Sequence, residues 1–214
     1  MKLKEIFDQL TYGELSQVSI GGGDIGEIRE PDYPKVAAHV TLGLTALHTR
    51  FNLKEGTYVL TIVPGTYTYT LSNVTDITKI ERVYSDTGLE LPLNVDGDPA
   101  SVRTAGYRTL VIPVDLVSTT LKVVYRANHK PLGEAEWSDP EATEIDIPYA
   151  YLEALLWYVA SRAMNPVGFA GGNGFHEGNN YLSKYEAACA MLEQQNVRND
   201  ETRVTDRFYR NGWV

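Results

Sequence analysis

Apolar residues recur at helical spacing near both ends of the chain and at every second position in its middle. The first helical stripe comprises Leu3, Ile6, Phe7 and Leu10. The second stripe comprises Val36, Val40, Leu44, Leu47 and Phe51. Each stripe predicts a helix with one buried face. His39 and His48 are nine residues apart on the second helix, so they cannot share a metal on one helix face, and we expect both in solvent.

Between residues 57 and 127 the pattern is typical of strands, because β-branched and aromatic residues dominate and alternate with polar ones. The expected strands lie within residues 57–74, 79–84, 89–95, 107–114 and 120–127. Pro64–Gly65 and the sequences SDTG and DGDP are typical of turns. No helical pattern interrupts the series, so we expect a small antiparallel sheet or barrel and not a parallel βαβ arrangement.

The helical period returns after residue 146. Residues 147–165 are apolar almost all round, which predicts a central, buried helix, and Pro166 is placed to end it. The glycine-rich sequence VGFAGGNGFHEGNN then predicts a mobile loop. A last helix is expected over residues 179–197, where Cys189 has no basic neighbour within one turn and is interpreted as a small core residue and not as a nucleophile.

This order of elements predicts an α+β fold, because neither helical half can bury its apolar faces alone. The expected architecture is a four-helix bundle with an antiparallel β-domain inserted between the second and third helices. The bundle would comprise residues 1–52 and 147–197, the inserted β-domain residues 53–146, and a C-terminal docking tail residues 198–214. Within 53–146, six acidic residues between Glu134 and Asp146 are interpreted as a solvated loop.

The charge of the chain excludes several classes of function. Its 214 residues carry a net charge of −9 and contain no basic run, so the chain should repel nucleic acid and not bind its phosphates.

No apolar run reaches the length of a membrane span, and the start lacks the apolar core of a signal peptide. A single cysteine excludes an internal disulfide, so we expect synthesis in a reducing cytoplasm.

The sequence predicts no enzymatic activity, no cofactor and no metal site. Gly21, Gly23 and Gly26 have the spacing G-x-G-x-x-G, but no strand leads into them and no helix opens at the last glycine. They are therefore interpreted as a linker between helices. Around Asp96, Pro92 and Arg103 occupy positions where a calcium loop needs carboxylates. No nucleophile elbow, P-loop or zinc-protease motif occurs.

The C-terminal segment VRNDETRVTDRFYRNGWV is unusual for a polar terminus, because arginines and aromatics are interspersed in it. Such residues dominate the binding hot spots of protein interfaces. The candidate docking residues are Arg203, Arg207, Phe208, Tyr209, Arg210 and Trp213. The alternative is that this segment folds back over its own subunit.

Several segments, taken in order, resemble the head-to-tail connector, or adaptor, proteins of tailed bacteriophages. The segments similar to the helices of that family are KLKEIFDQLTYGELSQVSIG, VTLGLTALHTRFNL, IDIPYAYLEALLWYVASRAMNP and NNYLSKYEAACAMLEQQNV. The segments similar to its inserted strands are LELPLN, YRTLVIPV and LKVVYRANHKPL. Each motif consists mostly of packing residues, so the specificity of the resemblance lies in their order along nearly the whole chain.

The resemblance implies a structural virion protein located at the neck, between capsid and tail. Such proteins form a ring, typically a dodecamer, which binds the portal protein on one side and a tail or nozzle protein on the other. DNA passes through the lumen without specific binding, and no membrane is involved. The alternative interpretation is a phage-associated β-module protein that binds a carbohydrate or receptor ligand through exposed aromatics such as Tyr67, Tyr69 and Tyr107.

Overall fold

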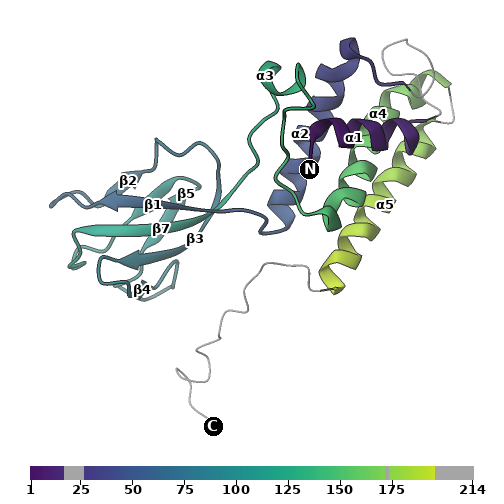
Figure 1. The fold of residues 1–214 in the computed structure, drawn as a ribbon. Coiled ribbons are helices and arrows are strands. Elements are labelled where there is room, and N and C mark those ends of the chain that lie inside the picture. The colour runs from purple at the N-terminus through teal and green to yellow at the C-terminus, as the bar shows by residue number, and fades with distance from the viewer. Residues whose placement is uncertain (17–26, 172–173, 196–214) are drawn as a thin grey trace, which may run out of the picture. The chain divides into compact units, whose positions relative to one another are not determined.

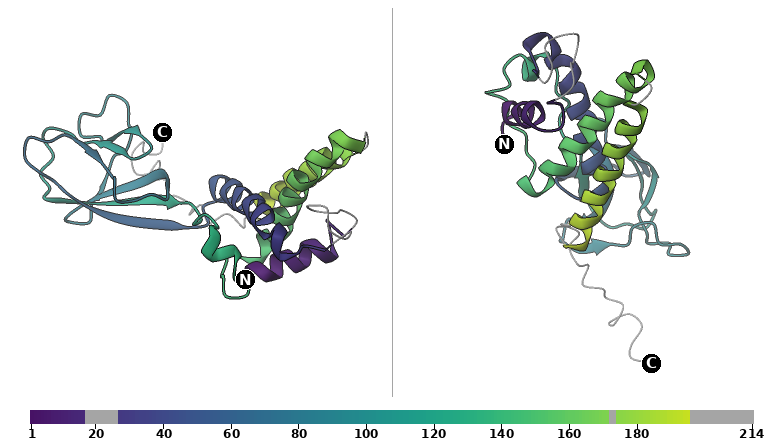
Figure 2. Two further views of the ribbon diagram at one scale, coloured as in Figure 1. Left: turned by 90° about the horizontal axis from the view of Figure 1, so that it is seen from above. Right: turned by 90° about the vertical axis from the view of Figure 1, so that its right-hand side faces the viewer.

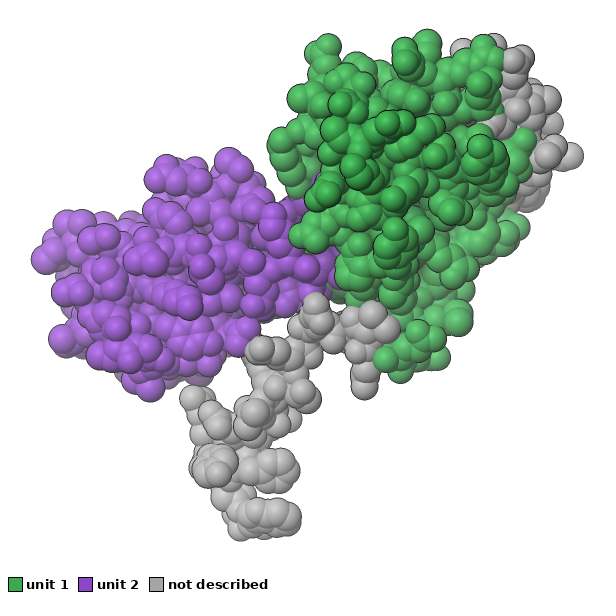
Figure 3. Space-filling view, viewed as in Figure 1, with its two compact units in different colours: residues 1–51, 130–214 green, residues 52–129 purple. Residues whose placement is uncertain are grey.

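The computed structural model describes residues 1–16, 27–171 and 174–195, without the side chains of residues 165–179. The chain forms two compact units, residues 1–51 with 130–214 and residues 52–129 (Figure 3). We call them the helical unit and the β-unit. The helical unit contains α1 (Leu3–Tyr12), η1 (Glu30–Asp32), α2 (Tyr33–Arg50), α3 (Glu134–Trp137), η2 (Tyr149–Tyr151), α4 (Leu152–Gly171) and α5 (Gly174–Gln194) (Figure 1).

Both apolar stripes near the N-terminus are buried, as the sequence predicts. Every stripe residue of α1 and α2 is at most 1% exposed. The helix α4 is the central one, because it contacts α1, α2 and α5, and it lies alongside α5 over much of its length (Figure 2). Gly43 permits the close approach of α2 to α4, since a Cβ at this position would lie 2.6 Å from Cδ1 of Leu155.

The expected four-helix bundle with an inserted β-domain is wrong. The described residues form five α-helices, and the strands divide between two antiparallel sheets, so the fold is mixed α+β. The additional helix, α3, lies in the acidic segment that was expected to be a solvated loop. The Gly133 amide donates to the Glu136 carboxylate over 2.9 Å, which satisfies a backbone group at the start of this helix.

The segment after α3 belongs to the helical unit because it pairs with the N-terminus of the chain. The first amides of α1 have no intrahelical partners. Those of Leu3 and Lys4 donate instead to the carbonyls of Thr143 and Pro140, over 2.9 and 3.0 Å. Periodicity could not reveal this pairing, because it joins residues that are far apart in the sequence.

Two other expectations about the helical unit are also wrong. Pro166 lies within α4, which continues to Gly171, and α5 begins at Gly174, so most of the expected glycine-rich loop is helical. Proline and glycine disfavour a helix by about 3 and 1 kcal/mol per residue, costs that a long helix packed along its neighbour can offset. His48 is only 1% exposed and lies in the core, whereas His39 is half-buried.

The β-unit contains seven strands in two antiparallel sheets. The strands are β1 (Glu55–Thr61), β2 (Thr68–Thr70), β3 (Ile77–Ser85), β4 (Glu90–Leu91), β5 (Arg103–Gly106), β6 (Thr109–Val111) and β7 (Thr120–Ala127). One sheet has the order β1-β7-β3-β4 and the other the order β2-β6-β5. Backbone bonds from Val102 to Pro92 and from Asn94 to Val102, both 2.8 Å long, join the β4 side of one sheet to the β5 side of the other.

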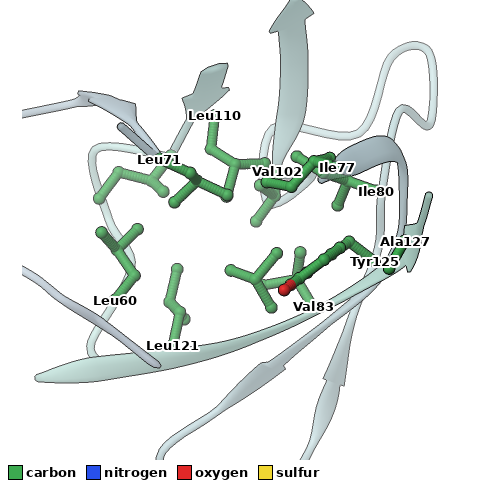
Figure 4. Close-up of a cluster of buried hydrophobic side chains, with 12 residues drawn as sticks. Leu60, Leu71, Ile77, Ile80, Val83, Val102, Leu110, Leu121, Tyr125 and Ala127 are labelled. Atoms are coloured by element: carbon green, nitrogen blue, oxygen red, sulfur yellow. The ribbon is translucent and has the colours of Figure 1, made fainter. Parts of the chain in front are cut away.

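The core of the β-unit lies between the two sheets (Figure 4). Its buried residues are Leu60, Leu71, Ile77, Ile80, Val83, Val102, Leu110, Ile112, Leu121, Val123, Tyr125 and Ala127. Tyr125 lies opposite Gly56 in the β1–β7 register, and a Cβ at Gly56 would lie 2.3 Å from its ring. The glycine therefore leaves the space that this aromatic ring occupies.

Candidate interaction surfaces

The sequence-predicted docking residues Arg203, Arg207, Phe208, Tyr209, Arg210 and Trp213 lie outside the described residues, as do Gly21, Gly23 and Gly26. The candidate surfaces are therefore those of the described residues.

One end of the β-unit exposes a group of apolar side chains. We call this group the apolar tip: Val63, Tyr67, Leu89, Val114 and Val117. The backbone register brings the turns of Val63, Leu89 and Val117 to the same end, because Thr61 pairs with Thr120 and Ser85 pairs with Leu121. Tyr67 follows the turn closed by the bond from the Thr66 amide to the Val63 carbonyl, and Val114 follows Ile112, whose amide donates to the Tyr67 carbonyl over 2.8 Å. Val117 is 96% exposed. Grouped apolar side chains on a protein surface are typical of interaction sites, whereas scattered ones are not.

Asp86 holds two turns of this end together. Its carboxylate accepts the Ser118 hydroxyl over 3.0 Å and the Thr119 amide over 3.0 Å, and the Thr119 hydroxyl over 3.2 Å. The bond from the Thr119 amide is the main reason that the pKa of Asp86 is lowered. At neutral pH the carboxylate is therefore ionised, and it fixes the turn before Leu89 against the turn after Val117.

A cationic and aromatic stack lies on the helical unit. Trp157 of α4 stacks on Tyr181 of α5, with ring centroids 5.6 Å apart and an interplanar angle of 24°. The Lys184 ammonium lies 4.4 Å from the Trp157 ring centroid and 5.0 Å from the Tyr181 centroid. Tryptophan and tyrosine combine large contact areas with polar groups, so this partly exposed stack is a second candidate contact surface.

Arg50 fastens the end of α2 to α5. Its guanidinium donates to Glu193 over 2.9 Å and to Glu186 over 2.5 Å. Nearby, Cys189 is fully buried, and this burial raises the pKa of its thiol. The prediction that Cys189 is a core residue is confirmed, and the cluster as a whole is a structural one.

The net charge of the chain lies in one of the two units. Residues 1–51 and 130–195 contain 17 acidic and 8 basic residues, whereas residues 52–129 contain 8 acidic and 7 basic ones. The exposed acids of the helical unit include Glu134, Asp139, Glu141, Glu144 and Asp146, all in the segment that contains or follows α3. The two units therefore present surfaces of different electrostatic character.

The three tyrosines considered as a ligand-binding face do not come together. The Tyr69 hydroxyl bonds to the backbone of Val63, donating to its carbonyl over 3.1 Å and accepting its amide over 2.7 Å. Tyr67 and Tyr107 are exposed, but Tyr67 lies beside Ile112 at one end of the β2–β6 ladder and Tyr107 lies beyond the other end. About four residues of strand, roughly 14 Å, separate them.

The apolar tip is not among the surfaces that the sequence predicts. A signal was present in Val63, which precedes Pro64–Gly65, and in Val114 and Val117, which lie between two expected strands. Turns usually lie at the protein surface, so apolar residues in them indicate exposed apolar side chains.

The described residues offer neither a metal site nor a membrane span. Among them, no group of three His, Cys, Asp or Glu side chains is placed to hold a metal ion. None of the described helices combines the length and apolar character that a bilayer span requires.

The whole sequence was also compared with known proteins. The family model described as SU10 adaptor protein matches residues 10–207. The chain belongs to this family of phage adaptor proteins. The match spans the helical unit, the β-unit and most of the C-terminal segment. Membership of this family makes the chain a structural component of the virion. No curated protein gives a significant match to this adaptor.

Proposed function

We propose that the adaptor forms a ring, a dodecamer, at the neck of the virion between the portal protein and a tail or nozzle protein. Each copy contacts the next through two different surfaces, since only heterologous contacts close into a ring of this size. The ring continues the DNA channel from the portal to the tail. The apolar tip and the aromatic stack on α4 and α5 are candidates for these contacts.

The observation that carries this proposal is the division of charge between the two units. Residues 1–51 and 130–195 carry an excess of nine acidic residues, which suits a channel wall. An anionic surface repels the phosphates of passing DNA, and it gains no binding free energy from the release of counterions. The nearly neutral β-unit lacks this repulsion and suits protein contacts. We therefore place the helical unit at the lumen.

We further propose that residues 198–214 dock onto another protein of the assembly. Ordering about seventeen residues costs on the order of 1–2 kcal/mol each in backbone entropy. Phe208, Tyr209 and Trp213 can offset this cost by burial, and the arginines by pairing with carboxylates.

The test is co-sedimentation of the adaptor with purified portal rings, together with electron microscopy of the complex. Replacing Phe208, Tyr209 and Trp213 by Ala should abolish most of the attachment while leaving the melting temperature nearly unchanged. Tyr12→Ala is the matched control, because Tyr12 is an exposed aromatic outside this segment, and it should attach normally. One or two copies per portal, instead of a full ring, would refute the proposal.

A further inference from the structure

The four edge strands of the β-unit differ in how well they are protected against pairing with a further strand. β4 has two residues, β2 has three, and β5 has four with an irregular register between Thr104 and Gly106. β1 has seven residues and pairs with β7 in an unbroken register from Glu55 to Thr61. Native proteins usually shorten, bulge, charge or cover an edge strand to prevent further pairing. Among the described strands, β1 therefore forms the longest regular edge.

The backbone register identifies the groups at this edge. The Ala127 amide donates to the Lys54 carbonyl over 2.8 Å, and the Ile62 amide donates to the Thr119 carbonyl over 2.9 Å. In an antiparallel ladder the direction of these groups alternates, so the even-numbered residues of β1 bond to β7. The odd-numbered residues direct their amides and carbonyls away from β7: Glu55, Thr57, Val59 and Thr61.

The side chains on this edge leave it accessible. All four odd-numbered residues are exposed, and Val59 is 64% exposed. β1 contains no proline and no lysine, and its one charged residue, Glu55, lies at its start. Its far end leads directly into Val63 of the apolar tip. One end of the edge thus carries the Glu55 carboxylate, which accepts from Arg82 over 3.3 Å and stays partly exposed, and the other end is apolar.

We propose that β1 binds residues 202–210 of a neighbouring copy as an added parallel strand. This inference rests on the docking role proposed above for residues 198–214, and it names the receiving surface. The segment TRVTDRFYR contains Val, Thr, Phe and Tyr, which favour strands, and three arginines against one acid. Backbone pairing along β1 supplies the affinity, as in other complexes formed by strand addition.

The ends of the two strands fix their relative direction. In a parallel arrangement Arg203 lies beside Glu55, where opposite charges attract. In this register Phe208 and Tyr209 lie beside Leu60 and Thr61, and Trp213 extends beyond Thr61 toward the apolar tip. An antiparallel strand would place the aromatic residues at the charged end of β1.

Pairing between two copies of β1 does not fit a ring. It would be isologous, with the same strand contributed by both partners, and would close at two copies. Insertion of a C-terminal strand into the edge of the next copy is heterologous and can continue around an axis.

The experiment uses the isotopically labelled full-length adaptor and an unlabelled synthetic peptide of residues 196–214. Amide hydrogen exchange and chemical shifts are followed by NMR as the peptide is added to millimolar concentration. At saturation the exchange of the Thr57, Val59 and Thr61 amides should slow at least tenfold, while the Tyr58 and Leu60 amides, already bonded to β7, should change little. A scrambled peptide should have no effect.

Val59→Pro removes one donor on the open side without removing a bond to β7, because proline is tolerated at outward positions of edge strands. This variant should bind the peptide at least tenfold more weakly. Val59→Thr is the matched control, because it changes the side chain but keeps the amide, and it should bind normally. If Val59→Pro fails to fold, Thr57→Lys and Thr57→Glu replace it, and they should weaken and strengthen binding of the arginine-rich peptide respectively.

Unchanged β1 amides at millimolar peptide would overturn the inference. Amides already protected in dilute full-length adaptor, independently of its concentration, would overturn it as well, because each segment would then pair with its own copy. If the peptide does not bind while the Phe208, Tyr209 and Trp213 variant still fails to attach to portal rings, the docking role stands and only the receiving surface is wrong.

Discussion

The helical unit and the β-unit differ in what they leave on their surfaces. The helical unit buries long apolar stripes and carries a large acidic excess, whereas the β-unit is nearly neutral and exposes the apolar tip and the β1 edge. An acidic surface discourages contact with nucleic acid, and an exposed apolar group favours contact with protein. In the proposed ring these two properties lie in different units of one chain, and a substitution confined to one unit should affect that unit alone.

The largest effect is expected at the contact between α2 and α4. Leu155 is fully buried, so Leu155→Ala should lower the free energy of unfolding of the helical unit by about 2–5 kcal/mol through lost burial and a cavity. Gly43→Ala should restore part of that loss in the Leu155→Ala background, because the added methyl points at the vacated space. Chemical denaturation followed by circular dichroism measures both effects. Equal destabilisation by Leu182→Ala, at an exposed position of α5, would contradict this account.

A smaller effect is expected in the β-unit at the contact between β1 and β7. Gly56→Ala places a methyl group against the Tyr125 ring and should cost about 1–3 kcal/mol through overpacking. Gly106→Ala on β5 is the control, because a Cβ there has its nearest neighbour at 3.8 Å. NMR hydrogen exchange of the Val83 and Leu121 amides should report the loss, while the amides of α4 stay protected. Loss of protection in both units would show that they unfold together.

The helical unit should also respond to mild acid. The pKa of His39 is lowered, first by burial and second by the nearby Arg162 guanidinium, so the folded state favours the neutral imidazole. The unfolded chain binds the proton near pH 6.5, so stability should be constant above about this value and fall below it. His39→Gln should flatten this dependence. Thermal melting between neutral pH and about pH 5.5 measures it, and an unchanged slope in the variant would assign the effect to another group.

The smallest effect is local and concerns the apolar tip. The lowered pKa of Asp86 means that its bonds to Ser118 and Thr119 contribute stability above the ordinary aspartate pKa of about 3.9. That contribution is lost as the pH falls through the lower folded value. Asp86→Asn should speed exchange of the Thr119 amide at neutral pH, with little change in global stability. Asp115→Asn is the control, because Asp115 is an exposed acid of the loop that contains Ser118 and Thr119, and it should leave this amide unchanged.

The spacing of apolar residues predicted those elements that bury one regular apolar face. The stripes of α1 and α2, the strand β7 and the buried Cys189 are all visible in the spacing of apolar residues. The same spacing did not predict elements that are held by contacts with residues far away in the sequence. α3 and the segment after it are held by Glu136 and by the amides at the start of α1, and neither interaction leaves a periodic trace.

The other wrong predictions rest on conformational preferences of single residues, which tertiary packing can override. Pro166 predicts the end of a helix, but α4 continues past it, because packing along α5 can offset one missing backbone bond. The nine-residue spacing of His39 and His48 excludes a shared metal and leads us to expect both in solvent, yet His48 is buried in the core. The strand β5 was not predicted, since Arg103–Gly106 has no apolar alternation and is positioned by its pairing with β6.

The burial of Cys189 has a practical consequence for studying the assembly. It is the single cysteine of the chain, it is fully buried, and burial raises the pKa of its thiol, so maleimides and disulfide cross-linkers should react with it slowly in the folded protein. A cysteine introduced at an exposed position such as Val117 therefore becomes the one fast-reacting thiol on each copy. Spin labels or cross-links could then report distances between neighbouring copies without first removing the native thiol.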